Sequence, residues 1–158
     1  MRVPIYFSAS ISGGRSDVPL YRRIVDHLSA RGHRIYAEHV ADASLRADGE
    51  TVTPEEIFRR DLDWIEEVAK SGGALVAEVS MPSIGVGYEI AAARYRFGMP
   101  VVCLYRPAHT RRCSAMVSGD REITLLAYEE DSLDQLLDAL GKRLDETRGA
   151  TSVRGSIR

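Results

Sequence analysis

The sequence predicts a single α/β domain built on a mostly parallel five-stranded sheet with helices on both faces. Short apolar runs alternate along the chain with longer segments in which apolar residues recur at helical spacing, and this alternation is typical of such folds. The chain has 158 residues, 44% of them apolar and 28% charged, which suits one globular domain with one core. Residues 1–147 form the predicted domain, and the polar residues 148–158 are expected to be a flexible tail.

Five short apolar runs predict the strands. They are bounded by glycine or polar segments, and their length is that of buried strands rather than of helices. The runs cover residues 3–8, 34–40, 74–79, 101–105 and 123–126.

Capping residues and glycines predict the helix ends. Thr53 and Glu56 form a capping box that opens the second helix, while Gly32 and Gly72 stand where C-terminal glycines belong. The third helix is expected to begin at about Tyr88, after a loop over residues 82–87. The expected helices cover about residues 17–31, 54–71, 88–97 and 133–144.

The charge balance and the cysteine count exclude several function classes. With 21 Lys and Arg against 23 Asp and Glu, the net charge of −2 does not attract nucleic acid or an acidic membrane. No apolar run is long enough for a signal peptide or a membrane span. Cys103 and Cys113 provide neither a disulfide framework nor a zinc spacing, so we expect a cytoplasmic protein without a bound metal.

The loop after the first strand is a candidate anion site. Its two glycines let the backbone approach a ligand, and the following helix start offers free N–H groups. The loop matches neither a dinucleotide fingerprint nor a Walker sequence, and turn geometry alone would also explain the glycine pair. The loop residues are Ser10, Ile11, Ser12, Gly13, Gly14 and Arg15.

Asp61 is the first candidate catalytic carboxylate. It falls on the same helical stripe as Ile57, Trp64 and Val68, which is expected to face the protein. A carboxylate on that stripe is either paired with an arginine or part of a site, and the spacing leaves both interpretations open.

Glu89 is the second candidate carboxylate. It follows Gly85 and Gly87, which would let a ligand lie close, and it is expected in the first turn of the third helix. A helix N-terminus stabilises an ionised carboxylate there, although glutamate is also favoured at helix starts for that reason alone.

Two further polar residues lie near the same edge of the sheet. Glu78 sits inside the third strand, where a carboxylate needs a polar partner, and we interpret it as a group that orients a neighbour. His39, at the end of the second strand, is either a structural histidine or a substrate contact. No G-x-S-x-G elbow or His-x-x-x-His pair is present, so the two carboxylates and the anion loop favour cleavage or transfer at a sugar carbon.

A set of short motifs spread over residues 3–145 is more specific than any of these features alone. The motifs are Tyr6-Phe7, Ser10-Ile11, Gly13-Gly14-Arg15, Tyr21, Arg23-Ile24-Val25, Glu38-His39-Val40, Asp61-Leu62, Trp64, Val76-Ala77-Glu78-Val79, Pro82-Ser83, Gly85-Val86-Gly87-Tyr88-Glu89, Cys103-Leu104, Arg106-Pro107 and Ser114-Ala115-Met116. In this order they resemble the family of 2'-deoxynucleoside 5'-phosphate N-hydrolases, which are relatives of the nucleoside 2-deoxyribosyltransferases.

The resemblance implies a Rossmann-like fold, a homodimer and an enzyme without metal or organic cofactor. It implies hydrolysis of the N-glycosidic bond of deoxynucleoside monophosphates to free base and 2-deoxyribose 5-phosphate. Glu89 would be the nucleophile, Asp61 the proton donor to the base, and Tyr6 would lie against the sugar. The substrate-binding residues on this basis are Ser10, Ile11, Ser12, Gly13, Gly14, Arg15, His39, Ser83, Gly85, Gly87, Met116 and, from the partner subunit, Ser114.

The chain departs from the family's pattern at two positions. Ala9 stands where the family usually has glycine, and Ser12 where it usually has arginine, which bears on the preferred base. Two other functions stay open: a deoxyribosyltransferase that passes the sugar to another base, and a nucleotide-binding module without catalysis. Ser10 and Ser83 favour the hydrolase because they suit a phosphate, and the two carboxylates argue against a binding module.

Overall fold

Five parallel strands form the centre of the molecule. The computed structural model describes residues 2–10, 15–37, 53–110 and 112–154 of the chain. The strands stand in the order β2-β1-β3-β4-β5, all parallel, which confirms the predicted α/β, Rossmann-like fold. They are β1 (Ile5–Ala9), β2 (Ile35–Tyr36), β3 (Ala74–Glu78), β4 (Val101–Tyr105) and β5 (Ile123–Ala127).

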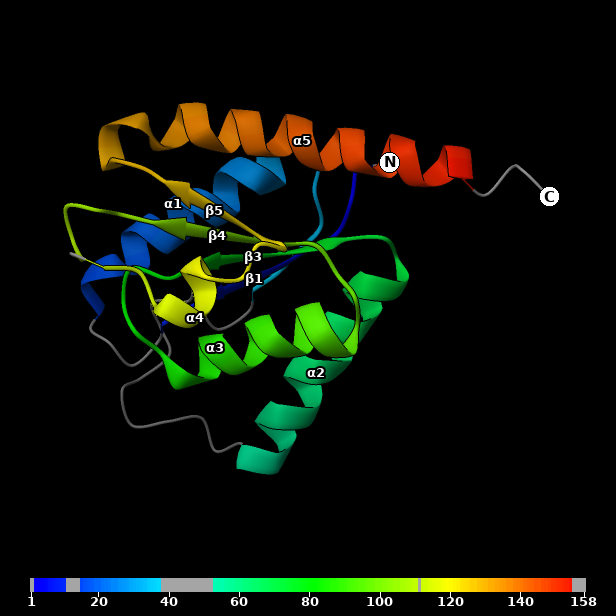
Figure 1. The fold of residues 1–158 in the computed structure, drawn as a ribbon, viewed down its shortest axis with the longest axis horizontal. Helices are drawn as coiled ribbons and strands as arrows, with labels where there is room; N and C mark the ends of the chain where they lie inside the picture. The colour runs from blue at the N-terminus through cyan, green and yellow to red at the C-terminus, as the bar shows by residue number, and fades with distance from the viewer. Residues whose placement is uncertain (1, 11–14, 38–52, 111, 155–158) are drawn as a thin grey trace.

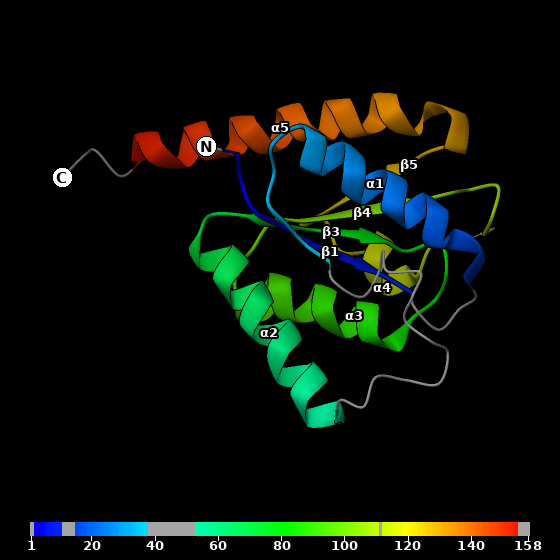
Figure 2. The ribbon, with the colours of Figure 1, turned by 180° about the vertical axis from the view of Figure 1, so that it is seen from behind.

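Helices cover both faces of this sheet. Figures 1 and 2 show α1 and α5 on one face, and α2 and α3 on the other. The short α4 lies on the side of α3 and follows β4 in the chain. The helices are α1 (Val18–Ala30), α2 (Pro54–Lys70), α3 (Ile84–Ala91), α4 (Ala115–Ser118) and α5 (Leu133–Arg154).

The alternation of side chains along β1 assigns its residues to two separate cores. Ile5, Phe7 and Ala9 pack with α1 and α5, whereas Tyr6 belongs to the core beneath α2 and α3. Since successive strand residues point to opposite faces, Ser8 shares the face of Tyr6. Polar groups on this face of β1 therefore point towards α3.

The strand order also places a reversal of the winding direction between β1 and β3. The chain leaves β1 for α1 on one face and leaves the neighbouring β3 for α3 on the opposite face. In open parallel sheets, ligands bind at the carboxyl ends of strands where the winding direction reverses in this way. The loops after β1 and β3 thus flank the expected binding edge.

The helix signals in the sequence agree with the structure at most positions. Thr53 accepts a hydrogen bond from the Glu56 amide at 3.3 Å, and the Glu56 carboxylate accepts one from the Thr53 amide at 2.9 Å, so the capping box is present. Gly32 and Gly72 have φ values of +88° and +69°, which glycine adopts at a helix end without strain. The second strand was predicted over residues 34–40 but covers only Ile35–Tyr36. The predicted residues 38–40 lie outside the described residues.

The start of the third helix was predicted wrongly. The helix begins at Ile84 rather than near Tyr88, and it continues beyond Ala91 as one π-helical turn over Ala92–Arg96. The hydroxyl of Ser83 accepts a hydrogen bond from the Val86 amide at 3.3 Å and caps the helix. The cap and the tertiary packing outweigh the low helix propensity of the two glycines.

Candidate active site

Glu89 lies at the centre of the site, with each carboxylate oxygen held by a hydroxyl from β1. The Tyr6 hydroxyl donates to Glu89 Oε1 at 3.2 Å, and the Ser8 hydroxyl donates to Glu89 Oε2. Tyr6 and Ser8 are two positions apart in one strand, so both side chains face α3. The structure thus joins a strand and a helix that are about 80 residues apart in the chain through one carboxylate.

The environment of Glu89 opposes its ionisation. Burial raises the pKa of the Glu89 carboxyl, and the negative charge of Asp61 raises it further. The hydrogen bonds from Ser8 and Tyr6 act in the opposite direction because they stabilise the carboxylate. Burial, followed by the charges of Glu89 and Asp61, also raises the pKa of Tyr6, so this hydroxyl keeps its proton and remains a donor.

The expectation that a helix N-terminus stabilises the ionised Glu89 is wrong. The residue is not in the first turn of its helix, because α3 begins at Ile84 and Glu89 is the sixth residue. The stabilising effect of a helix N-terminus falls off within one turn, and the pKa is raised rather than lowered. The ionised form relies on the two hydroxyls of β1 instead.

Asp61 is paired with an arginine, which is one of the two interpretations of its place on the stripe. Its Oδ1 accepts a hydrogen bond from Arg60 Nε at 3.1 Å, so it is paired with an arginine. Its charge also acts on Glu89 and on Tyr6, which places it in the same electrostatic site. The stripe itself is only partly buried, because Ile57 is 37% exposed while Val68 is buried.

The predicted phosphate contacts lie at the carboxyl ends of β1 and β3. Ser10 directly follows β1 and is buried, and Ser83 is half-buried at the start of α3. Arg15 opens the short 3-10 helix η1 (Arg15–Asp17). Ile11, Ser12, Gly13, Gly14 and His39 lie outside the described residues.

The surface of α3 is open around its two glycines. Both Gly85 and Gly87 are exposed, and a Cβ atom at Gly87 would meet no other atom within 4 Å. A Cβ at Gly85 would come no closer than 3.8 Å to Ser83 Oγ. Packing within the chain does not require glycine at either position, which is compatible with room for a ligand.

Ser114 and Met116 lie at α4, on the surface of the subunit. Ser114 precedes α4 and is exposed, and Met116 is 85% exposed. The polar contacts that the described residues make with Glu89 come from β1 and not from α4. Within one subunit Tyr6 contacts Glu89 and the charge of Asp61 acts on it, whereas no hydrogen bond to Glu89 comes from Ser114 or Met116.

Sequence reasoning missed Ser8. Its hydroxyl is buried in an apolar strand, and a polar residue in such a run is the signal that could have revealed it. The alternation that assigns Tyr6 to the α3 face assigns Ser8 to the same face.

Glu78, interpreted from the sequence as a group that orients a neighbour, has its polar partners in a buried cluster and not in the carboxylate pair. It is fully buried and accepts hydrogen bonds from the Ser80 amide at 3.2 Å and from the Tyr128 hydroxyl at 3.0 Å. Arg106 Nε lies 3.5 Å from Glu78 Oε1, and burial raises the pKa of Glu78. This buried cluster connects the loops that follow β3, β4 and β5.

Metal and membrane signals are absent from the part of the chain that the structure describes. No three His, Cys, Asp or Glu side chains there gather as metal ligands would. None of the helices in these residues combines the length and the apolar run needed to cross a membrane.

Comparison with known proteins gives a consistent set of relatives. No family model matches the chain. A protein of Nematostella vectensis with the provisional name 2'-deoxynucleoside 5'-phosphate N-hydrolase 1 is 41% identical over 138 residues, 84% of this chain and 90% of its own length. The 5-hydroxymethyl-dUMP N-hydrolase of Homo sapiens is 40% identical over 142 residues, 87% of this chain and 78% of its own.

A solved structure supports the fold. The solution structure of BlsM superposes with a TM-score of 0.68 and covers 89% of this chain and 90% of its own, at 18% identity. At that identity the likeness concerns the fold alone.

Proposed function

The chain belongs to the 2'-deoxynucleoside 5'-phosphate N-hydrolase family, and we propose that it hydrolyses the N-glycosidic bond of 2'-deoxynucleoside 5'-monophosphates. The products are free base and 2-deoxyribose 5-phosphate. The observation that carries the proposal is the half-buried carboxylate of Glu89, which hydroxyls of β1 hold at both oxygens and on which the charge of Asp61 acts.

The reaction proceeds in two steps with Glu89 as nucleophile. A Glu89 oxygen bonds to C1' while the bond from C1' to the base nitrogen breaks, and Asp61 gives the base a proton. Water then attacks C1' of the glycosyl ester, its proton returns to Asp61, and the C1'–oxygen bond to Glu89 breaks. Tyr6 donates to Glu89 Oε1 in the free protein, and in this proposal its side chain lies against the sugar.

Ser10 and Ser83 bind the 5'-phosphate in this proposal. They follow β1 and β3, the two strands between which the winding direction reverses, and Ser83 stands at a helix start whose free N–H groups favour an anion. Phosphate binding away from C1' orients the anomeric carbon against Glu89 and so contributes to the rate. The backbone of residues 11–14 stays a predicted part of this contact.

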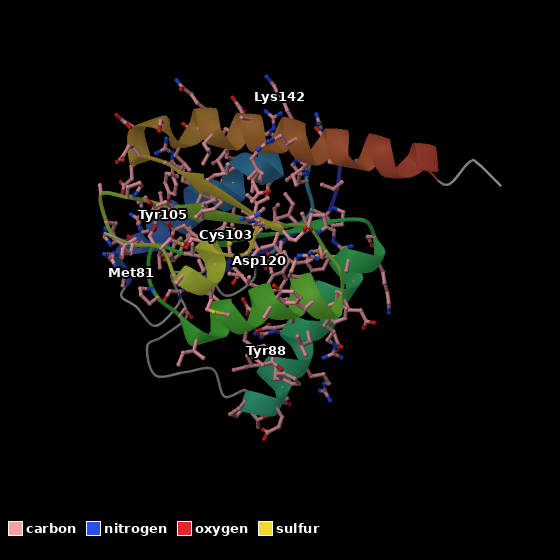
Figure 3. All side chains as sticks on the ribbon, in the orientation of Figure 1. Met81, Tyr88, Cys103, Tyr105, Asp120 and Lys142 are labelled. Carbon is pink, nitrogen blue, oxygen red and sulfur yellow. The ribbon has the colours of Figure 1, made fainter. Side chains whose placement is uncertain are left out.

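The partner subunit completes the site through Ser114. Four large apolar side chains are exposed on the helices of this face of the sheet: Phe58 on α2, Ile84 and Tyr88 on α3, and Met116 on α4. Tyr88, labelled in Figure 3 below α3, packs edge to face on Phe58 with ring centroids 6.0 Å apart, and Ile84 is 95% exposed. Large exposed apolar side chains are typical of a protein interface, and we expect a second copy of the chain to cover them.

Chromatography of reaction products tests the proposal. The substrates are dGMP and 5-hydroxymethyl-dUMP, the latter because the human relative is named for it, with dG and GMP as controls. We expect free base from a deoxynucleoside monophosphate and little from dG or GMP. Release from dG but not from dGMP, or a new nucleoside when an acceptor base is added, would favour the transferase instead.

A further inference from the structure

The hydroxyl of Ser8, at the centre of the site, has no role in the fold or in the proposed reaction so far. It is buried in the middle of β1, where it pairs with Ala77 of β3 through the backbone. The strand pairing involves only the main chain of Ser8, so the hydroxyl does not contribute to the sheet. That hydroxyl donates to Glu89 Oε2, while Tyr6 holds Oε1.

An attacking carboxylate must be ionised and held in one orientation. Burial and the negative charge of Asp61 on α2 both oppose ionisation of Glu89. Arg60, also on α2, is paired with Asp61. On the side of β1, only hydroxyls of the described residues contact the carboxylate, and they are neutral donors. A neutral donor stabilises the anion without forming an ion pair that attack on carbon would have to break.

We propose that Ser8 is a positioning residue of the nucleophile, which holds Glu89 Oε2 so that the carboxylate stays oriented and ionised for attack. This inference rests on the proposed function, because it concerns the same carboxylate. Ser8 touches Glu89 and not the substrate, so its removal lowers kcat and leaves KM nearly unchanged.

The first measurement follows the ionisation of Glu89 directly. The ¹³C resonance of the Glu89 side-chain carboxyl is titrated in glutamate-labelled protein and assigned with the Glu89→Gln variant. In Ser8→Ala the midpoint is expected to rise by about one pH unit, a tenfold change in the ionisation constant. Ser8→Cys, whose thiol is a weaker donor, is expected to lie between Ser8→Ala and the native protein.

The second measurement is the pH dependence of hydrolysis. The acidic limb of kcat is expected to move to higher pH in Ser8→Ala, in step with the titration, and activity is expected to recover as the pH rises. An acidic limb and a titration midpoint that both stay in place would overturn the role of Ser8.

Ser80→Ala is the matched control. Ser80 is also a buried serine whose hydroxyl donates to a carboxylate, that of Glu78. A loss of stability without a shift in the Glu89 titration is expected there. If Ser8→Ala does not fold, Ser8→Cys, which differs from the native residue in a single atom, carries the test.

The two proposals fail separately. The titration needs no turnover. If the native protein cleaves no nucleotide but Ser8→Ala shows the shift, the proposed function is wrong and the effect of Ser8 on Glu89 still holds. A protein that cleaves nucleotides but shows no shift contradicts Ser8 alone.

Discussion

Arg106 and Asp17 form a buried ion pair in which Arg106 Nη2 lies 2.5 Å from Asp17 Oδ2. The same guanidinium contacts Glu130 at 2.8 Å and lies 3.5 Å from Glu78. Asp17 stands just before α1, Glu78 ends β3, and Arg106 follows β4. One cation therefore joins the carboxyl ends of β3 and β4 to the segment between β1 and α1.

The first prediction concerns the stability that this cation provides. Arg106→Met leaves the buried carboxylates of Asp17 and Glu78 without their cation, so we expect the free energy of unfolding to fall by about 3–5 kcal/mol. Urea denaturation measures the change. Arg23→Met is the control: it breaks the exposed pair with Asp134, whose atoms are 2.9 Å apart, and should leave the midpoint within error. Equal losses in both variants would show that burial of the pair is unimportant.

The second prediction concerns the nucleophile. Glu89→Gln keeps the shape of the side chain but cannot form a glycosyl ester, so turnover is expected to drop by about three orders of magnitude or more with the fold intact. Product release under single-turnover conditions is the measurement. Glu66→Gln changes an exposed carboxylate that pairs with Lys70 on α2, and it should retain native turnover. Normal activity of Glu89→Gln would place the nucleophile elsewhere.

The third prediction follows from the raised pKa of Glu89. Burial raises the pKa of Glu89 above the unfolded value of about 4.5, so the folded protein holds this proton more tightly than the unfolded chain. The free energy of unfolding therefore falls as the pH rises from the unfolded pKa through the folded pKa of this group. Glu89→Gln removes the buried charge. We expect its melting temperature to exceed the native one by a few degrees at pH 7 and the gain to disappear near pH 4. A gain of the same size at both pH values would exclude ionisation as the cause.

The fourth prediction separates the phosphate contact from the helix cap at Ser83. Ser83→Gly removes the hydroxyl but caps a helix nearly as well, so the stability should change by only a few tenths of a kcal/mol. Loss of a hydrogen bond to a charged phosphate is expected to lower kcat/KM for the monophosphate about tenfold or more. Cleavage of the free deoxynucleoside, already slow, should not fall further. A parallel loss on both substrates would point to a disturbed helix instead.

The fifth prediction tests the shared site. If Ser114 enters the partner's site, Ser114→Ala and Glu89→Gln inactivate different halves of it. Mixed subunits then form one site with both native residues, and activity should return when two weak or inactive variants are combined and allowed to exchange. Light scattering on the native protein should give the mass of a dimer. Mixtures no more active than the sum of their parts would contradict a site completed by the partner's serine.

Local signals in the sequence determined most of the elements. The capping box of Thr53 and Glu56, and the glycines at 32 and 72, act through contacts within one turn of the chain and could be recognised without a structure. The alternation in β1 likewise separates Tyr6 from its neighbours Ile5 and Phe7. The resemblance to a family selected Tyr6, Asp61 and Glu89, and the structure brings these three together.

Tertiary structure alone decided which polar groups meet. Glu78 and Glu89 are both glutamates close to the ends of regular elements, yet one binds Arg106 and Tyr128 while the other receives the hydroxyls of Tyr6 and Ser8. These partners are distant in the chain, and the order of the strands sets which loops and faces lie side by side. Burial, which depends on that same packing, then sets the ionisation of Glu89, because the cost of a charge is a property of its surroundings and not of its sequence neighbours.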